Sequence, residues 1–243
     1  CFVGTWAAGS ALAMDKLATK LLAAKLGIST PDSCVLDGGQ LLVNGTIRSP
    51  ISHPVVVKPV HDGSSVGLHI CRTDEDWHQA QSQIRADIEL HPQRTYMIER
   101  FTPGRELTTS VIADPDQPGQ LQVLPLIEIA PEQGVYDFEA KYERSDTKYT
   151  VEPEIEPEIT RSIQEQTLRI CEALGVRHLA RADFLLRDDR TWVMLEVNTM
   201  PGFTATSLLP KAAGAIGLKM PMLCEHIVRC AKHDKSPITT PTR

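Results

Sequence analysis

The sequence predicts a mixed α/β (α+β) protein of two lobes, with antiparallel strands and helices to one side. Amphipathic segments with helical spacing alternate along the chain with short apolar runs of strand length. The 243 residues suffice for one large domain or two small ones, and 42% hydrophobic with 23% charged residues is an ordinary globular balance. A Pro103-Gly104 turn divides the pattern, so we place one lobe at 1–103 and the second at 104–232.

The first lobe begins with a helix predicted over 10–26, where apolar residues recur at helical spacing until a glycine stops the helix. Residues 37–53 are rich in Gly, Asn, Ser and Pro, which indicates turns around a short hairpin. A helix over 74–86 follows, with Thr73 or Asp74 as its N-cap. Apolar runs predict strands at 55–58, 66–71 and 96–99, and residues 62–67 form a connection that we call the Gly-Ser loop.

Strand and helix patterns continue through the second lobe, with one exception at 131–150. The polar residues and interspersed aromatics of this stretch have no clear period. A long loop of this kind is uncommon inside a compact domain and is often an active-site lid, so we predict a lid there. We expect a disordered tail at 233–243. The predicted strands lie at 105–113, 120–130, 179–187 and 191–198, and the predicted helices at 157–174, 208–216 and 221–232.

Charge and cysteine content narrow the classes of function. The formal net charge is −6 and no basic run is interleaved with aromatic residues, so we expect no nucleic-acid partner. No apolar stretch approaches the roughly 20 residues that span a bilayer, so we expect no membrane partner. None of the six cysteines forms a C-x-x-C pair, which is typical of a reducing compartment and favours a cytoplasmic location. The chain begins with Cys1 rather than Met, which indicates a fragment or a processed product.

The most informative local feature is a predicted hairpin with Arg181 and Asp183 on one strand and Glu196 and Asn198 on the other. Side chains alternate faces along a strand, so each pair shares a face. An even loop, such as 188–191, would place Asp183 opposite Glu196, whereas an odd loop without a bulge would place them on opposite faces; we predict the even loop. Two close carboxylates favour a cation between them, and hard oxygen ligands suit Mg²⁺. A solvated polar strand face is the alternative interpretation.

A second feature indicates a phosphate site. Lys58 ends an apolar strand, where its charge needs a partner, and the Gly-Ser loop follows closely. Glycines let backbone N–H groups approach an anion, and Ser64 and Ser65 add donors. Such a loop also occurs as an ordinary turn, and the strand–P-loop–helix signature is absent. The pattern leaves open which other charged residues belong to this site among Lys16, Lys20, Lys25, Glu99 and Glu106.

These residues stand in an ordered series of motifs that resembles D-alanine–D-alanine ligases over most of residues 4–232. Single pieces are weak, but the ordered combination is very specific. The series runs Ala13-Met14-Asp15-Lys16, Val57-Lys58-Pro59, Gly63-Ser64-Ser65-Val66-Gly67, Ile98-Glu99, Gly104-Arg105-Glu106, Tyr136-Asp137-Phe138-Glu139-Ala140-Lys141-Tyr142, Arg181-Ala182-Asp183, Glu196-Val197-Asn198-Thr199-Met200-Pro201-Gly202-Phe203-Thr204 and Ser207-Leu208.

The resemblance implies an ATP-grasp fold, with ATP between the two α+β lobes. It also implies two Mg²⁺ ions, for which Mn²⁺ can substitute, and ATP and D-alanine as small-molecule partners. A homodimer is the implied state of the full-length enzyme. The implied residue roles are ATP contacts from Lys16, Lys58, Ser64, Ser65, Glu99, Glu106 and Lys141, metal ligation by Asp183, Glu196 and Asn198, and catalysis or substrate binding by Arg181, Ser64, Tyr142, Gly202 and Ser207.

The activity that the resemblance implies is ATP-dependent joining of two D-alanines through an acyl phosphate, for peptidoglycan precursor synthesis. Glu99 and Glu106 would hold adenine and ribose, and lid closure would deliver Lys141 and Tyr142. The lid sequence Glu139-Ala140-Lys141-Tyr142 resembles the dipeptide-forming type rather than the D-alanine–D-lactate type.

One departure from the family bears on activity. The family has an N-terminal domain of roughly a hundred residues, a domain-sized unit that this sequence lacks. We therefore expect the chain alone to bind Mg·ATP weakly and to ligate poorly or not at all. Two other interpretations stay open: an ATP-grasp ligase with another acceptor, such as D-lactate, and an inactive nucleotide-binding remnant.

Overall fold

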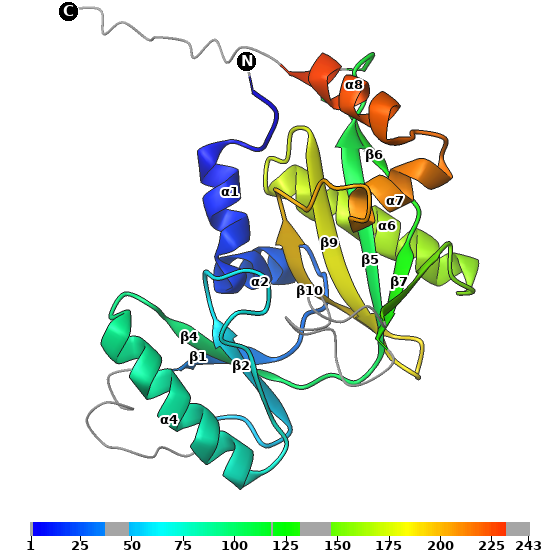
Figure 1. Ribbon diagram of the computed structural model, residues 1–243. Coiled ribbons are helices and arrows are strands. Elements are labelled where there is room, and N and C mark those ends of the chain that lie inside the picture. The colour runs from blue at the N-terminus through cyan, green and yellow to red at the C-terminus, as the bar shows by residue number, and fades with distance from the viewer. Residues whose placement is uncertain (1, 37–48, 118, 132–146, 232–243) are drawn as a thin grey trace, which may run out of the picture.

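A computed structural model of the chain describes residues 2–36, 49–117, 119–131 and 147–231, which form two lobes (Figure 1). Each lobe is built on a β-sheet, and every strand pair in the described residues is antiparallel. The prediction of two lobes with antiparallel strands is therefore confirmed. The predicted boundary at Pro103-Gly104 falls in the connection between the two sheets.

The first lobe is a four-stranded sheet with one long helix packed on it. The helix, α4 (Asp74–Leu90), buries Trp77, Ile84 and Ile88 against the sheet. Thr73 caps it as predicted, because the Thr73 hydroxyl accepts from the Asp76 N–H and the Asp76 carboxylate accepts from the Thr73 N–H. The strands lie in the order β1 (Ser33–Leu36), β4 (Tyr96–Arg100), β2 (Val55–Pro59) and β3 (His69–Cys71).

The second lobe is a larger sheet whose central strand, β5, has apolar residues on both faces. Leu107 and Val111 of β5 enter one core, and Ile112 enters another. The strands run in the order β10 (Trp192–Asn198), β9 (Leu179–Leu186), β5 (Arg105–Ala113), β7 (Ile127–Pro131) and β8 (Thr147–Val151), with β6 (Leu121–Val123) beside β5.

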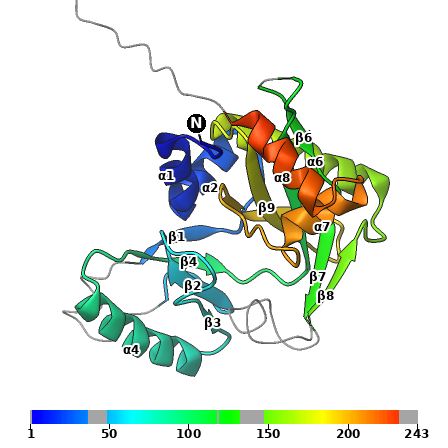
Figure 2. The same ribbon diagram turned by 45° about the horizontal axis from the view of Figure 1, so that its top comes forward.

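Helices cover both faces of this second sheet (Figure 2). Helix α6 (Pro157–Ala173) packs in the core that contains Leu107, whereas α7 (Leu208–Ala215) and α8 (Met220–Cys230) pack in the core that contains Ile112. The prediction that helices lie to one side is therefore wrong for this sheet. A strand that is apolar on both faces must be covered on both faces.

Two helices stand where the sequence predicts one helix over 10–26. They are α1 (Ala7–Met14) and α2 (Lys16–Lys25), and Asp15 between them has an extended backbone, with φ −80° and ψ 102°. The Asp15 carboxylate accepts a hydrogen bond of 2.9 Å from the Ala18 N–H and so caps α2. The single-helix prediction fails because an aspartate that can cap the next helix also ends the one before it.

The first two helices pack against the second lobe, although the predicted division at Pro103-Gly104 assigns them to the first lobe. Both contact β10, and α2 also contacts α6. Ala13, Ala23 and Ile28 belong to the same core as α6. Helix α2 also lies beside the sheet of the first lobe (Figure 1). Its Lys20 side chain forms an ion pair with Glu99 of β4.

Three strand predictions need correction. The strand predicted over 120–130 is two strands, β6 and β7, separated at Pro125, which lacks the N–H that a strand ladder requires. The strand predicted over 66–71 begins only at His69. The end of the predicted lid is strand β8, paired with β7.

Other expectations lie largely outside the described residues: most of the hairpin at 37–53, most of the lid and the tail at 233–243. Within the described residues, no helix is long and apolar enough to cross a membrane. The cysteines there are free thiols.

The cap of α4 gives the first testable prediction. Thr73→Ala removes the hydroxyl that accepts from Asp76 N–H, and we expect it to lower the free energy of unfolding by about 1 kcal/mol. Urea denaturation measures this change. Thr73→Ser keeps the hydroxyl and should stay within about 0.5 kcal/mol of the unmodified chain. Equal losses in both variants would show that the cap contributes nothing.

Candidate active site

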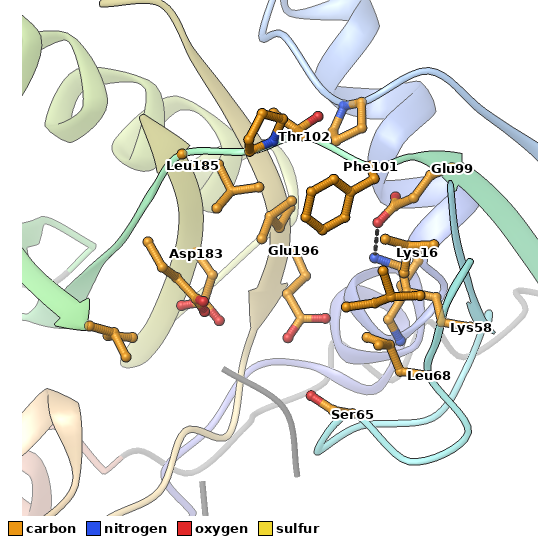
Figure 3. Close-up of a pocket in the computed structure, with 18 of the residues that line it drawn as sticks. Lys16, Lys58, Ser65, Leu68, Glu99, Phe101, Thr102, Asp183, Leu185 and Glu196 are labelled. Atoms are coloured by element: carbon orange, nitrogen blue, oxygen red, sulfur yellow. Dashed lines mark hydrogen bonds and ion pairs between the residues drawn. The ribbon is translucent and has the colours of Figure 1, made fainter. Parts of the chain in front are cut away.

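A pocket of about 380 Å³ opens between the two sheets, and residues of both lobes line it (Figure 3). Lysines of α2 and β2 and the Gly-Ser loop form one wall, and the ends of β9 and β10 form the other. Apolar side chains, among them Leu68, Phe101 and Leu185, line the part between. The pocket therefore combines an apolar interior with charged groups of opposite sign on its two walls.

Glu99 is the most buried charged residue of the lysine wall, with 3% of its surface exposed. Lys58 Nζ lies 2.5 Å from Glu99 Oε1, and Lys20 Nζ lies 3.1 Å from Oε2. Lys20 also donates to the Pro31 carbonyl at 3.2 Å. A buried carboxylate is costly unless it is paired, so the two lysines stabilise Glu99, and Glu99 fixes the position of both ammonium groups.

The pKa values of this wall follow from burial and from the neighbouring charges. Burial alone would raise the pKa of Glu99, but Lys58 and Lys20 outweigh burial, and the pKa lies below its ordinary value of 4.5. Burial lowers the pKa of Lys16 and of Lys20; Glu196 partly offsets this for Lys16, and Glu99 does so for Lys20. A polyanion in the pocket would favour the charged form of both lysines.

The Gly-Ser loop has a constrained backbone. Ser64, Ser65 and Gly67 have φ angles of 55°, 58° and 68°, a region that non-glycine residues rarely adopt. At Gly67 a side chain would also be crowded, because an added Cβ would lie 3.0 Å from Pro59 Cγ and 3.2 Å from the Tyr96 hydroxyl oxygen. The surrounding structure therefore holds this loop in a shape that the serines alone would not choose.

Lys16 joins the loop to helix α2. Its Nζ donates to the carbonyl oxygens of Asp62, at 2.5 Å, and of Val60, at 3.4 Å. Its side chain also lines the pocket. The ammonium group is thus placed between the start of the Gly-Ser loop and the pocket interior.

The turn between β9 and β10 is odd, and the predicted even loop is wrong. Arg187 N–H donates to the Thr191 carbonyl at 2.8 Å, which leaves residues 188–190 as the loop. Arg190 closes the loop with φ 67°, as in three-residue hairpin loops that end in a left-handed residue.

A β-bulge nevertheless brings the two carboxylates together. The register shifts by one residue between Met194 and Glu196, which leaves Leu195 as the extra residue, and Glu196 then pairs with Asp183. The predicted juxtaposition is thus confirmed, by a bulge rather than by the loop. Figure 3 shows Asp183 and Glu196 on neighbouring strands beside the pocket.

Arg181 and Asp183 form a tight pair on β9. Arg181 Nε donates to Asp183 Oδ1, and its Nη2 donates to Oδ2, both at 2.8 Å. The Thr108 hydroxyl donates to Oδ1 at 2.6 Å. The Glu196 side chain differs, because it forms no hydrogen bond or ion pair within the described residues, although its charge raises the pKa of Lys16. On the second wall, the Asp183 carboxylate is therefore shared with Arg181 and Thr108, whereas the oxygens of the Glu196 carboxylate remain available to a ligand.

The donor set on this wall fits Mg²⁺ in chemistry. Asp183 and Glu196 are opposite each other, and Asn198, two residues after Glu196, adds an amide oxygen that accepts from the Met200 N–H at 2.9 Å. Hard oxygen ligands of this kind, one or two carboxylates with phosphate and water oxygens, are the usual magnesium set. Among the described residues no three His, Cys, Asp or Glu side chains form a metal-binding group, so a third protein oxygen would come from Asn198.

Gly202 lies in the connection between β10 and α7, and Ser207 is the N-cap residue of α7; neither lines the pocket. The Ser207 hydroxyl accepts from the Thr204 N–H at 3.0 Å, and a Cβ at position 202 would lie 2.9 Å from Ser207 Oγ. These two predicted residues are therefore adjacent to each other.

The pocket brings together seven of the residues predicted for the site: Lys16, Lys58, Ser65, Glu99, Glu106, Asp183 and Glu196. Ser64, Arg181 and Asn198 stand next to this group in sequence or in contact with it, and Lys141 and Tyr142 lie outside the described residues. Lys20 is the residue that sequence reasoning missed. The available signal was its position four residues after Lys16, which places both on one face of α2.

Comparison with known proteins decides the family. Residues 22–229 match the family model described as "D-ala D-ala ligase C-terminus". The chain belongs to the D-alanine–D-alanine ligase family. The D-alanine–D-alanine ligase of Desulforudis audaxviator is 36% identical over 231 residues, which cover 95% of this chain and 72% of that protein. The ligase of Halalkalibacterium halodurans is 37% identical over 224 residues, covering 89% of this chain and 68% of that protein.

Solved structures of D-alanine–D-alanine ligases agree with the fold. The crystal structure of the Bacillus anthracis enzyme complexed with ATP matches with a TM-score of 0.72 and 27% identity, over 94% of this chain and 69% of that chain. The ATP-grasp fold expected from the resemblance is therefore confirmed.

The lysine pairs of Glu99 predict an acid-dependent loss of stability. The folded-state pKa of Glu99 is lowered, so the unfolded chain binds its proton first as pH falls. The stabilisation is thus complete above the ordinary value of 4.5 and is lost as pH falls through the lowered folded-state pKa. We expect the unmodified chain to lose more stability between pH 7 and pH 4 than Glu99→Gln, measured by urea unfolding.

The control for this experiment is Glu165→Gln, a change at an exposed position of α6. Its pH dependence should follow that of the unmodified chain. An equal acid loss in Glu99→Gln would show that the two lysines do not stabilise the carboxylate.

Proposed function

We propose that this protein joins two D-alanines in an ATP-dependent reaction that passes through an acyl phosphate. The observation that carries the proposal is the pocket between the lobes, with Lys16 and Lys58 on one wall and the Asp183–Glu196 pair on the other. Such a pocket suits a polyphosphate chelated by a cation. Family membership and the ATP complex of the Bacillus anthracis relative support ATP as the nucleotide.

The proposed phosphate contacts come from three parts of the chain. Lys16 and Lys58 stand at the pocket with ammonium groups held by fixed partners. The Gly-Ser loop, with Ser64 and Ser65, would place its donors over the phosphates. Lys141, delivered by the lid, is proposed to reach the γ-phosphate. Adenine and ribose are assigned to Glu99 and Glu106, and positioning of this kind accounts for most of the catalysis in phosphoryl transfer.

Asp183, Glu196 and Asn198 are the proposed ligands of Mg²⁺. The ion, when bound, would neutralise charge on the transferring phosphoryl group. Asp183 already shares its oxygens with Arg181 and Thr108. The unshared carboxylate of Glu196 is therefore the group that would contribute most to attracting a cation to this wall.

The acceptor half of the reaction is assigned to Arg181, Gly202 and Ser207. In the first step a carboxylate oxygen of one D-alanine attacks the γ-phosphorus of ATP, and ADP leaves. In the second step the amine of the other D-alanine attacks the acyl carbon, loses a proton, and phosphate leaves. Arg181 and the Gly202 N–H would stabilise the oxyanion of the tetrahedral intermediate. Ser207 would bind the carboxylate of the second D-alanine.

Water must be kept from the acyl phosphate, which a closing segment accomplishes in many enzymes. We assign this task to the lid, with Tyr142 beside Ser64 at the first substrate. The lid sequence supports an amine acceptor over D-lactate.

The test of the proposed function is phosphate release from Mg·ATP by the purified chain, with and without D-alanine. D-alanine-dependent release, together with D-alanyl-D-alanine as product, would support the proposal. D-Lactate and L-alanine serve as matched acceptors, and release that depends on either of them instead would contradict the D-alanine assignment. ATP binding without release would limit the proposal to the nucleotide site, and an absence of ATP binding would refute it.

The metal assignment makes a prediction that needs no turnover. We expect Mg²⁺ to strengthen ATP binding by the unmodified chain, and Glu196→Gln to reduce that gain on the order of tenfold, because it removes the unshared carboxylate. Calorimetric titration with ATP, in the presence of Mg²⁺ or of EDTA, measures the gain. Glu165→Gln on α6 is the control. The same gain in both variants would rule out Glu196 as a ligand.

A further inference from the structure

The start of the Gly-Ser loop carries an acidic side chain that the proposed function does not use. Asp62 lines the pocket and begins the loop. Its carbonyl accepts from Lys16 Nζ, and its carboxylate raises the pKa of Lys16, whose net pKa is lowered by burial. A carboxylate at this position competes with phosphate for the Lys16 ammonium group and repels a polyanion.

Arg94 stands on the other side of this carboxylate. Arg94 Nε lies 2.8 Å from Asp62 Oδ2, and both side chains are half-buried, with 24% and 33% of their surfaces exposed. A pair at this depth is less screened by solvent than an exposed ion pair. Arg94 therefore neutralises the carboxylate of Asp62, a residue that lines the pocket.

Asp87 of helix α4 holds Arg94 in place. Arg94 Nη1 lies 2.5 Å from Asp87 Oδ1, and the Tyr96 hydroxyl donates to Asp87 Oδ2 at 2.8 Å. Burial would raise the pKa of Asp87, but the hydrogen bonds from Arg94 and Tyr96 outweigh it and the pKa is lowered. The Arg94 guanidinium is thus fixed from two sides, by α4 and by the loop.

The same network reaches the other end of the Gly-Ser loop. The Tyr96 hydroxyl oxygen lies 3.2 Å from the position of a Cβ at Gly67, where the loop ends. The carboxylate of Asp87 on α4 therefore orients two side chains: Arg94, which pairs with Asp62 at the start of the loop, and Tyr96, whose hydroxyl lies close to the backbone at Gly67. A loop that is held in place before a ligand binds needs less ordering on binding.

We propose that Arg94 is a positioning residue for nucleotide binding, which neutralises Asp62 and anchors the Gly-Ser loop to α4 so that Lys16 stays available for phosphate. This inference rests on the proposed function, because it takes a nucleoside triphosphate as the ligand. Arg94 itself does not line the pocket in the described residues, so it acts through Asp62.

The test compares Arg94→Gln, Asp62→Asn and the double variant in calorimetric titrations with Mg·ATP. Arg94→Gln leaves the Asp62 carboxylate uncompensated, and we expect it to weaken binding about tenfold. Asp62→Asn removes the uncompensated charge, so the double variant should return to within about threefold of the unmodified chain.

Controls separate this role from a loss of folding. Arg229→Gln breaks an exposed ion pair with Asp116 in the second lobe, where Nη2 and Oδ1 are 2.6 Å apart, and it should leave Mg·ATP binding unchanged. Urea denaturation of each variant shows whether the titrated protein is folded. In the double variant, the free energy of unfolding is compared with that of Arg94→Gln, which shows whether a rescue of affinity accompanies a change in stability.

Each outcome of the Mg·ATP titrations either supports the role proposed for Arg94 or overturns it. Weakened binding in Arg94→Gln with rescue by Asp62→Asn supports the proposal. Unchanged binding in Arg94→Gln, or weakened binding without rescue, overturns it while the proposed function stands. An absence of Mg·ATP binding by the unmodified chain overturns the proposed function and this inference together.

Discussion

The buried carboxylate of Glu99 is the point at which separate parts of the chain meet. Glu99 belongs to β4, Lys58 to the neighbouring strand β2, and Lys20 to α2, which packs in the core of the second lobe. The ion pairs therefore connect the first sheet to a helix of the other lobe. Because a buried charge without partners costs several kcal/mol, this connection fixes the relative position of α2 and the sheet more strictly than apolar packing would. The lysine wall of the pocket exists only in that arrangement.

The charged side chains on the two walls of the pocket are compensated in different ways. On the lysine wall, Glu99 compensates two ammonium groups, while Lys16 is held by carbonyl oxygens, which satisfy its donors but leave its charge uncompensated by a direct ion pair. On the opposite wall, Asp183 is compensated by Arg181, while Glu196 forms no ion pair within the described residues. Each wall thus keeps one charge that a ligand can use, cationic on one side and anionic on the other. A polyphosphate and a divalent cation bound together would match both.

Helices and strands with a clear period of apolar residues could be predicted from the sequence. A break or an irregularity that depends on a single residue could not. The strand over 105–113 was predicted with its observed bounds, because seven of its residues are buried and the turn before it is marked by Pro-Gly. The helix over 10–26 was predicted without its break, because Ala and Leu continue past Asp15 at helical spacing. An aspartate can end a helix, or it can stand on the exposed face of a continuous helix. Which of these occurs depends on the tertiary contacts of the residues before and after it. Here, those contacts include the Lys16 N–H, which donates to the Val60 carbonyl.

The hairpin of the candidate site is a second case in which the pattern of apolar and polar residues does not predict a local irregularity. The prediction that Asp183 lies opposite Glu196 depended on an even loop between the strands, and that loop parity was wrong although the two residues do pair. The hairpin departs from regular geometry twice, with an odd loop and with a bulge at Leu195. Their effects on which face the side chains occupy cancel each other. Neither departure can be read from the pattern of apolar and polar residues. A bulge adds one residue, and one residue inverts every face beyond it. The expectation that Asp183 and Glu196 lie opposite each other is thus met by a different backbone geometry from the one assumed for the turn. Two carboxylates held this close favour a cation between them, whichever irregularity of the hairpin brings them together.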